Sequence, residues 1–334
     1  MDIAVFLVGF LVTAVITAVI LRFLIPYLKS IKMGQKILDI GPRWHKSKEG
    51  TPTMGGVSFI IGSVPALIAI IFILMNNGGY GYIAPLCVTW LMAVAYGLTG
   101  ALDDRTKFAH HTNEGLTAPQ KYALQFGIAI AYIAAMRIFG FIDTTVWLPF
   151  IGREIDLGIF WYPIALVALT GIDNGVNLSD GIDGLCSSIA LAVGIFFAAA
   201  GFRSADPSVT AAAAIMAGAC AGFLVYNWHP ARVFMGDTGS LFLGGMVVGC
   251  AFLLDNILIL LICGLIYIIE CLSVVLQVGY FKLTHGKRLF KMAPLHHHYE
   301  MSGWSEKKIC RVFSIVGAVG GAAAIALAWF GRTM

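Results

Sequence analysis

The sequence is poor in charge: only 12% of its 334 residues are Asp, Glu, Lys or Arg, whereas a soluble domain carries about 25%. It lacks a basic stripe with base-stacking groups, so nucleic acid is not an expected partner. It begins Met-Asp without a basic segment or a small-residue cleavage site, and we expect a retained first helix rather than a signal peptide. Its seven cysteines show no C-x-x-C spacing, which indicates neither a zinc site nor a disulfide framework.

Apolar sequence is abundant at 59%, and it is arranged in long uninterrupted blocks. Such blocks reach the ~20 residues that a helix needs to cross a bilayer. The sequence therefore predicts an all-α polytopic membrane protein, a single domain over 1–334 with about ten transmembrane helices. The predicted spans are 3–25, 55–75, 82–101, 119–138, 160–173, 184–201, 209–226, 239–254, 257–279 and 310–330, of which the fifth is short for a full crossing.

Most of the 22 Lys and Arg residues fall in loops on one side of these spans, chiefly within 29–48, 105–121 and 282–311. Cytoplasmic loops carry such an excess, so this side is predicted to be cytoplasmic and both termini to lie outside. The clusters of Asp, Asn, His and Gly lie on the same side. This arrangement favours an enzyme with its active site on the cytoplasmic face, since a transporter more often places polar groups near the midplane.

Two adjacent carboxylates, Asp103 and Asp104, end the third predicted span, and Lys107 follows them. Neighbouring carboxylates repel each other unless a proton or cation relieves them. Mg²⁺ does so readily, because it accepts one or two carboxylates together with phosphate oxygens. A solvated helix end is the alternative interpretation of this pair.

A run of ligand-type residues, NGVNLSDGIDG, occupies 174–184 between two apolar spans. Glycine lets the backbone approach a ligand closely, and Asn or Asp can bind a sugar, a base or a hydrated metal. The order of residues does not match an EF-hand. A plain turn remains the alternative.

The segment 226–240 contains Asp237 where the eighth span is predicted to begin. Asp237 could cap that helix. Alternatively, it could hold Mg²⁺ beside a helix N-terminus that favours phosphate.

Three consecutive histidines lie at 296–298 in the last basic loop, and Glu270 and Gln277 share one face of the ninth span. Adjacent histidines do not face one centre, so hydrogen bonding or phosphate contact is favoured over zinc. Glu270 either serves function, as intramembrane ionisable residues often do, or pairs with a neighbouring helix. Together the motifs supply acidic, basic and backbone groups suited to phosphoryl transfer, which depends mainly on positioning and charge neutralisation.

At these motifs the sequence resembles the phospho-N-acetylmuramoyl-pentapeptide transferases, within the superfamily of polyprenyl-phosphate N-acetylhexosamine-1-phosphate transferases. The resemblance covers essentially the whole chain. It rests on five segments in order: GTPTMGG (50–56), DDRTK (103–107), NLSDGIDGL (177–185), FMGDTGSL (234–241) and HHHYE (296–300).

The resemblance implies transfer of phospho-MurNAc-pentapeptide from UDP-MurNAc-pentapeptide to undecaprenyl phosphate with Mg²⁺, giving lipid I and UMP. It implies a multi-pass protein of the bacterial inner membrane and a homodimer. It assigns catalysis to Asp103, Asp104, Asp237, Lys107, Lys121 and His296, with Asp237 as the Mg²⁺ ligand. The implied substrate contacts are Asn177, Asp180 and Asn227 around the phosphates, Gly181, Asp183, Phe234 and Gln277 at the uridine, and His297 and His298 at the donor. The alternatives are a transferase that uses UDP-GlcNAc and, in another class, a polyprenyl-lipid transporter.

Overall fold

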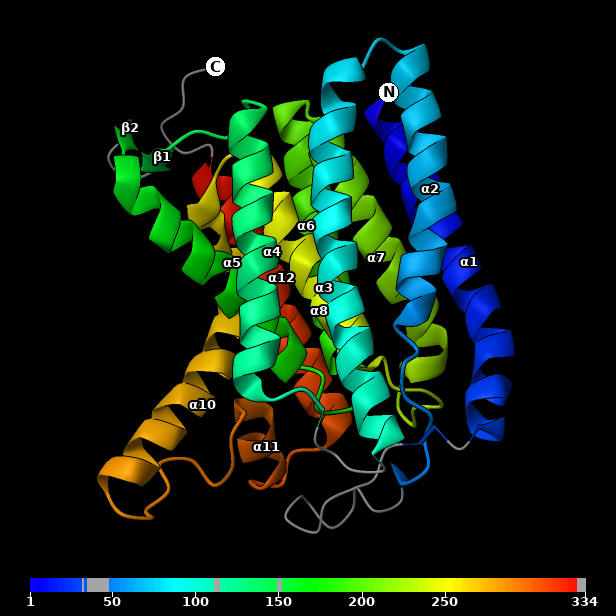
Figure 1. Ribbon diagram of the computed structural model, residues 1–334, viewed down its shortest axis with the longest axis vertical. Helices are drawn as coiled ribbons and strands as arrows, with labels where there is room; N and C mark the ends of the chain where they lie inside the picture. Colours follow the sequence, from blue (N-terminus) through cyan, green and yellow to red (C-terminus); the bar gives the residue numbers. More distant parts are fainter. Residues whose placement is uncertain (32, 35–47, 111–114, 149–151, 329–334) are drawn as a thin grey trace.

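The computed structural model describes residues 1–31, 33–34, 48–110, 115–148 and 152–328. In this part of the chain, long helices run side by side through a bundle (Figure 1). Nine of the described helices are long and apolar enough to cross a membrane. The principal helices are α1 (Asp2–Ser30), α2 (Val57–Asn76), α3 (Ile83–Ala109), α4 (Ala118–Ile138), α5 (Trp161–Leu178), α6 (Leu185–Ser204), α7 (Pro207–Asn227), α8 (Gly236–Leu253), α10 (Leu265–Leu283) and α12 (Glu306–Ala328).

Helix α4 is the predicted span that falls outside those nine. Its 21 residues, roughly 30 Å of helix, run along the bundle beside α3 (Figure 1). Its first turns carry Gln120, Lys121 and Gln125, which lower the apolarity of this span. A capping box at Thr117 and Gln120 fixes its start.

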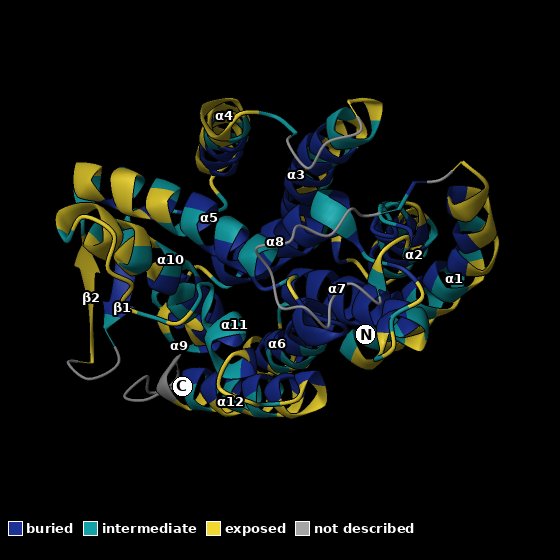
Figure 2. Ribbon diagram, turned by 90° about the horizontal axis from the view of Figure 1, so that it is seen from below, coloured by how far each residue is buried: buried dark blue, intermediate teal, exposed yellow. Residues whose placement is uncertain are grey.

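The centre of the bundle is formed by α7 and α8, which are almost wholly buried, while α1, α4 and α10 expose broad faces (Figure 2). Close packing depends on small residues. A Cβ atom added at Gly218 or Gly222 of α7 would overlap the backbone of α1 at Phe10 and Ala14. Helix contacts of this kind are typical of membrane bundles, where lipid offers no hydrophobic drive for association.

Several helices extend beyond the predicted spans into polar sequence. The third was predicted to end at 101, but α3 continues to Ala109. The fifth was predicted to end at 173, but α5 continues to Leu178. Apolarity marks where a helix leaves the bilayer core and not where its backbone hydrogen bonds stop. As a result, Asp103, Lys107 and Asn177 lie on helices and not in loops.

The ninth predicted span, 257–279, is broken. A short 3-10 turn (Ile257–Ile259) leads into α9 (Leu260–Cys263), and Gly264 separates α9 from α10. Helix α10 then leans away from the bundle (Figure 1). Further 3-10 turns precede α3 (Tyr80–Tyr82) and α5 (Gly158–Phe160).

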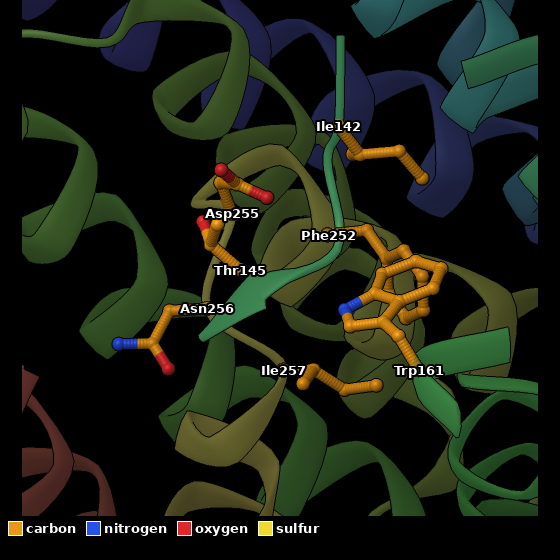
Figure 3. Close-up of a pocket in the computed structure, with 7 residues that line it drawn as sticks. All are labelled: Ile142, Thr145, Trp161, Phe252, Asp255, Asn256 and Ile257. Carbon is orange, nitrogen blue, oxygen red and sulfur yellow. The ribbon is translucent and has the colours of Figure 1, made fainter. Parts of the chain in front are cut away.

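A small antiparallel hairpin, β1 (Thr145–Leu148) with β2 (Arg153–Asp156), was not predicted from the sequence. Four-residue strands give little periodic signal. The hairpin lies at the end of the bundle where α1 begins and α12 ends (Figure 1). Beside it is a small pocket lined by Ile142, Thr145, Trp161, Phe252, Asp255, Asn256 and Ile257 (Figure 3).

Helix α1 begins and α12 ends at the same end of the bundle (Figure 1). That both termini lie outside stays a prediction. The polar motifs gather at the opposite end, where α3, α5 and α7 end and α4 and α8 begin.

Candidate active site

Three carboxylates meet where the end of α3 contacts the start of α8. Oxygens of Asp103, Asp104 and Asp237 all lie within 4.8 Å of one another, a spacing that could hold a metal ion. Gly100 permits the approach, since a Cβ atom there would overlap the backbone of Asp237 and Thr238. The resemblance to the family implied this acidic centre, from two motifs more than a hundred residues apart.

Asp104 binds the first turn of α8 with both carboxylate oxygens. Oδ1 accepts the backbone N–H of Asp237 at 3.1 Å. Oδ2 accepts the backbone N–H of Thr238 at 3.0 Å and its hydroxyl at 2.7 Å. Asp104 therefore caps α8 from another helix, because the first N–H groups of a helix have no partner within it.

This arrangement corrects one alternative offered by the sequence. Asp237 was a candidate N-cap, but the N-cap position is Met235 and Asp237 lies inside the first turn. Its side chain therefore does not cap the helix. It points instead to side chains of three other helices.

Asp237 is the hub of the site. Its Oδ2 accepts from the ammonium groups of Lys107 at 3.0 Å and Lys121 at 2.8 Å. Its Oδ1 accepts from the side-chain amide of Asn177 at 2.8 Å. Asn177 also donates to the Ser240 hydroxyl at 2.7 Å and accepts from Lys121 at 3.2 Å. The predicted residues of α3, α4, α5 and α8 are therefore brought together.

Asp103 completes the cluster. Its Oδ2 pairs with Lys107 at 2.6 Å, and its Oδ1 accepts the backbone N–H of Leu116 at 2.8 Å. Among these groups, three carboxylates face two ammonium groups. The excess of negative charge favours a further cation, and the ammonium groups are placed to bind phosphate oxygens.

Asp180 lies in the loop between α5 and α6, beside this cluster. Burial raises the pKa of its carboxyl well above the usual range, and the negative charges of Asp237, Asp104 and Asp183 raise it further. The protonated form of the Asp180 carboxyl is therefore favoured, and a nearby cation or hydrogen-bond donor would favour the ionised form instead.

A second polar cluster, formed by Lys48, Asp183, His229 and Glu306, lies at the other end of that loop. Lys48 Nζ lies 2.7 Å from Asp183 Oδ1 and 2.6 Å from Glu306 Oε2. Asp183 Oδ2 accepts the backbone N–H of Ala231 at 2.9 Å and lies 3.2 Å from His229 Nδ1. The ammonium group of Lys48 already supplies the positive charge between the two carboxylates. We therefore interpret this cluster as an ion-paired clamp that joins four segments.

Sequence reasoning missed Lys48 and Glu306 as site residues. Lys48 was counted only as one of many basic loop residues, and Glu306 was placed in a loop before the predicted span 310–330. The available signal was that Lys48 lies two positions before the GTPTMGG segment. Nothing in the sequence pairs it with Glu306, 258 positions away.

Two of the predicted substrate contacts, Asn227 and Phe234, form hydrogen bonds with the backbone of neighbouring loops. The buried Asn227 accepts the backbone N–H of Gly184 at 3.1 Å and donates to the carbonyl of Val233 at 2.9 Å. Phe234 joins its motif to the GTPTMGG segment: its N–H donates to the carbonyl of Pro52 at 2.8 Å, and its carbonyl accepts from Gly55 at 2.9 Å. Asn227 and the Phe234 backbone thus shape the loops that surround the cluster.

The three histidines lie on the short helix α11 (Leu295–Glu300) and face different partners, as the sequence predicted. His296 Nδ1 lies 3.0 Å from Glu270 Oε2, and His297 Nδ1 lies 2.6 Å from Glu300 Oε2. His298 Nδ1 accepts the backbone N–H of Lys291 at 3.2 Å.

The side chain of Gln277 in α10 is hydrogen-bonded to the backbone of the loop before α11. Its Oε1 accepts the backbone N–H groups of Leu289 and Phe290, at 3.0 and 2.8 Å, and its Nε2 donates to the Phe290 carbonyl at 3.2 Å. The side chain therefore holds this loop in the structure. Its predicted contact with uridine would require some of these bonds to open.

Comparisons with known proteins agree with the motifs. A family model described as glycosyl transferase family 4 matches residues 86–255. A model described as phospho-N-acetylmuramoyl-pentapeptide-transferase signature 1 matches residues 48–60. A protein of Clostridium botulinum (strain Alaska E43 / Type E3) named phospho-N-acetylmuramoyl-pentapeptide-transferase is 44% identical over 294 residues, or 87% of each chain. The chain belongs to the phospho-N-acetylmuramoyl-pentapeptide-transferase family.

Other members of the phospho-N-acetylmuramoyl-pentapeptide-transferase family are similarly close. One from Clostridium novyi (strain NT) is 44% identical over 303 residues, covering 89% of this chain and 88% of its own. One from Staphylococcus aureus (strain bovine RF122 / ET3-1) is 42% identical over 302 residues, covering 89% and 91%. The signature segment of the family begins at Lys48, so it contains the lysine of the ion-paired clamp.

Proposed function

We propose that this chain transfers phospho-MurNAc-pentapeptide from UDP-MurNAc-pentapeptide to undecaprenyl phosphate, releasing UMP and forming lipid I for peptidoglycan. The observation that carries the proposal is the hub at Asp237, where Lys107, Lys121 and Asn177 converge from three other helices. Phosphoryl transfer needs this combination of fixed negative and positive groups. Family membership supplies the substrate class.

The donor set fits Mg²⁺. The cluster offers carboxylate oxygens and no thiolate among the residues described, and such hard oxygen ligands suit Mg²⁺. Asp237 and Oδ2 of Asp103 would hold the ion, because these oxygens contact only side chains, whereas both oxygens of Asp104 accept backbone N–H groups of α8. When bound, Mg²⁺ neutralises pyrophosphate charge and improves the leaving group.

In the proposed reaction, an oxygen of the lipid phosphate attacks the β-phosphorus of the UDP-sugar. The bond from that phosphorus to the bridging oxygen of the α-phosphate breaks, and UMP leaves with the bond's electron pair. Lys107 and Lys121 would bind the phosphate oxygens and offset the developing charge. Asp103 could accept a proton from the lipid phosphate. The second pKa of that phosphate is about 6, so it needs only modest help from a general base.

A covalent route through an acyl phosphate is the alternative. We favour the direct route, because Asp103 and Asp237 each form hydrogen-bonded ion pairs with lysine, which lower carboxylate nucleophilicity. Trapping a phospho-aspartate during turnover would rule out the direct route.

We place the protein in the bacterial inner membrane with the Asp237 cluster on the cytoplasmic face, where a UDP-sugar is available. The basic loops at this end support that orientation. A lipid acceptor reaches the same end from within the bilayer. The homodimer implied by the sequence resemblance stays a prediction.

The test is UMP release by the purified protein with undecaprenyl phosphate and Mg²⁺, using UDP-MurNAc-pentapeptide and UDP-GlcNAc in parallel. We expect release only from the muramoyl donor, and loss of release without Mg²⁺ or in Asp237→Asn. Asp156→Asn, on the exposed hairpin at the far end, is the matched control and should retain activity. Release only from UDP-GlcNAc would assign the sister activity, and lipid movement without UMP release would assign a transporter.

A further inference from the structure

A buried carboxylate lies on α10, a helix that is otherwise largely exposed. Glu270, in the second turn of α10, is fully buried, whereas Leu272, Leu276 and Leu283 farther along the helix are exposed. An ionised side chain inside a membrane span is costly unless it is paired and hydrogen-bonded. The reaction proposed above gives Glu270 no role.

The partner of Glu270 is His296, which is also fully buried. Oε2 of Glu270 lies 3.0 Å from His296 Nδ1, and Oε1 accepts the His296 backbone N–H at 3.2 Å. Both carboxylate oxygens are therefore committed to one residue. An ionised carboxylate only accepts hydrogen bonds, so Nδ1 carries the proton and Nε2 of a neutral ring does not.

The free nitrogen of His296 is pressed against the loop between α5 and α6. Its Nε2 has no hydrogen-bond partner among the described residues. A Cβ atom added at Gly181 would overlap Nε2 and lie 2.7 Å from Cε1 of the ring. A protonated Nε2 here would bury an unpaired N–H, which is a further reason for the Nδ1–H tautomer.

The contact continues into the site. Gly181 follows Asp180 and precedes Asp183, and the carboxylate of Asp183 pairs with Lys48. Contacts therefore run from Glu270 in α10 through His296 to the loop, and from the loop to Lys48. A shift of His296 would move backbone that carries three predicted substrate contacts, Asp180, Gly181 and Asp183.

We propose that Glu270 is a positioning residue for the transfer reaction. Its carboxylate fixes the tautomer and the position of His296, and the ring of His296 fixes the Asp180–Asp183 loop against the donor nucleotide. The inference rests on the proposed function and adds to it a residue that lies outside the Asp237 cluster. It assigns the contribution of Glu270 to the donor and not to the lipid acceptor.

The direct test is Glu270→Gln. A glutamine amide that still accepts the His296 backbone N–H would present its NH₂ group to Nδ1, so the ring proton should move to Nε2, toward Gly181. With ring-¹⁵N-histidine, and His296→Gln to assign the signal, we expect Nε2 of His296 to change from unprotonated to protonated. Glu270→Asp keeps the charge and should keep the wild-type tautomer.

We expect the catalytic efficiency to fall in the variant in which the tautomer of His296 changes. A displacement of about 1 Å at a reacting centre costs on the order of 10²-fold in rate, and we expect a loss of this order in kcat/KM for the UDP-sugar. KM for the lipid acceptor should stay unchanged, and Glu270→Asp should recover part of the loss. Glu154→Gln, on the hairpin at the opposite end, is the control and should match wild type.

Gly181→Ala tests the contact from the other side and keeps the inference testable if Glu270→Gln does not fold. The added methyl group should displace His296 and raise the donor KM, whereas Gly279→Ala on α10, which has open space around it, should not. Because both changes act through one contact, the double variant should be no worse than the poorer single variant.

Additive losses in the double variant would overturn the proposal. So would a Glu270→Gln protein with wild-type kcat/KM, or one that loses activity while the tautomer of His296 is unchanged. A wild-type protein that releases no UMP would refute the proposed function separately. The ¹⁵N measurement needs no substrate and would still decide whether Glu270 sets the tautomer.

Discussion

At the scale of single residues, the structure separates two adjacent aspartates that the sequence presents as a pair. Asp103 faces Lys107 and the proposed metal site, whereas Asp104 is turned to the backbone of α8. One residue of rotation along α3, about 100°, accounts for the difference. Asp104 therefore contributes by holding Asp237 in place.

Asp104→Asn should lower the thermal stability of the protein. The substituted amide has one oxygen in place of two, so an N–H group at the start of α8 would lose its acceptor. An unsatisfied buried donor costs about 1–3 kcal/mol. We expect a lower melting temperature in detergent for Asp104→Asn than for Asp237→Asn, whose carboxylate accepts only from side chains. Equal melting temperatures would contradict the capping role.

Asp180 should make stability depend on pH in an unusual direction. An unfolded aspartate releases its proton near pH 3.8, but burial holds the pKa of Asp180 well above this value. Between the two pKa values the folded protein binds the extra proton, so stability falls as pH rises through this window. The side chain introduced by Asp180→Asn does not titrate. The melting temperature of this variant should therefore increase relative to that of wild type as pH rises, and the difference should become constant above the raised pKa.

Asp156 provides a control, because its effect on the pH dependence of stability should have the opposite sign. Hydrogen bonds from the Thr144 hydroxyl and the Gly158 N–H lower the pKa of its carboxyl. That contribution to stability is present above the ordinary pKa and is lost as pH falls through the lowered one. The melting temperature of Asp156→Asn should therefore approach that of wild type in acid. A pH-independent difference for Asp180→Asn would refute the assignment.

At the scale of elements, the site depends on how closely α3 approaches the start of α8. Gly100 is the point of contact, and no larger residue fits against the backbone of Asp237 and Thr238. The approach brings Lys107 within reach of Asp237, 130 positions later in the chain. A change in helix spacing should therefore reach the chemistry directly.

Gly100→Ala should separate the two helices and disrupt the carboxylate cluster. Overpacking of a close contact typically costs about 1–3 kcal/mol, and we expect a lower melting temperature together with weaker divalent-cation binding. Gly127→Ala in α4 is the matched control, because a Cβ atom there has open space. Mn²⁺ binding followed by electron paramagnetic resonance would measure the effect. Wild-type affinity in Gly100→Ala would show that the helix spacing does not set the site.

At the scale of the whole molecule, the sequence allowed the helical bundle to be predicted, because long apolar blocks specify spans. The proximity of Asp103 to Asp237 was expected from the resemblance to the family, and the structure brings the two carboxylates together. The break at Gly264 could not be predicted, because a run of apolar residues crosses it without interruption. Neither could the bond between Lys48 and Glu306, since long-range contacts depend on how helices pack and not on local sequence.

The orientation of the bundle remains a prediction, and it decides which compartment supplies the donor. Single cysteines at Lys307, at the start of α12, and at Glu154, on the hairpin, would report on opposite ends of the bundle. Five of the seven native thiols are buried, which limits background labelling. The excess of Lys and Arg at the Asp237 end predicts that a membrane-impermeant maleimide labels Glu154→Cys in intact cells and Lys307→Cys only in inverted vesicles. The reverse pattern would place the cluster outside, away from cytoplasmic UDP-sugars, and would contradict both the orientation and the proposed donor.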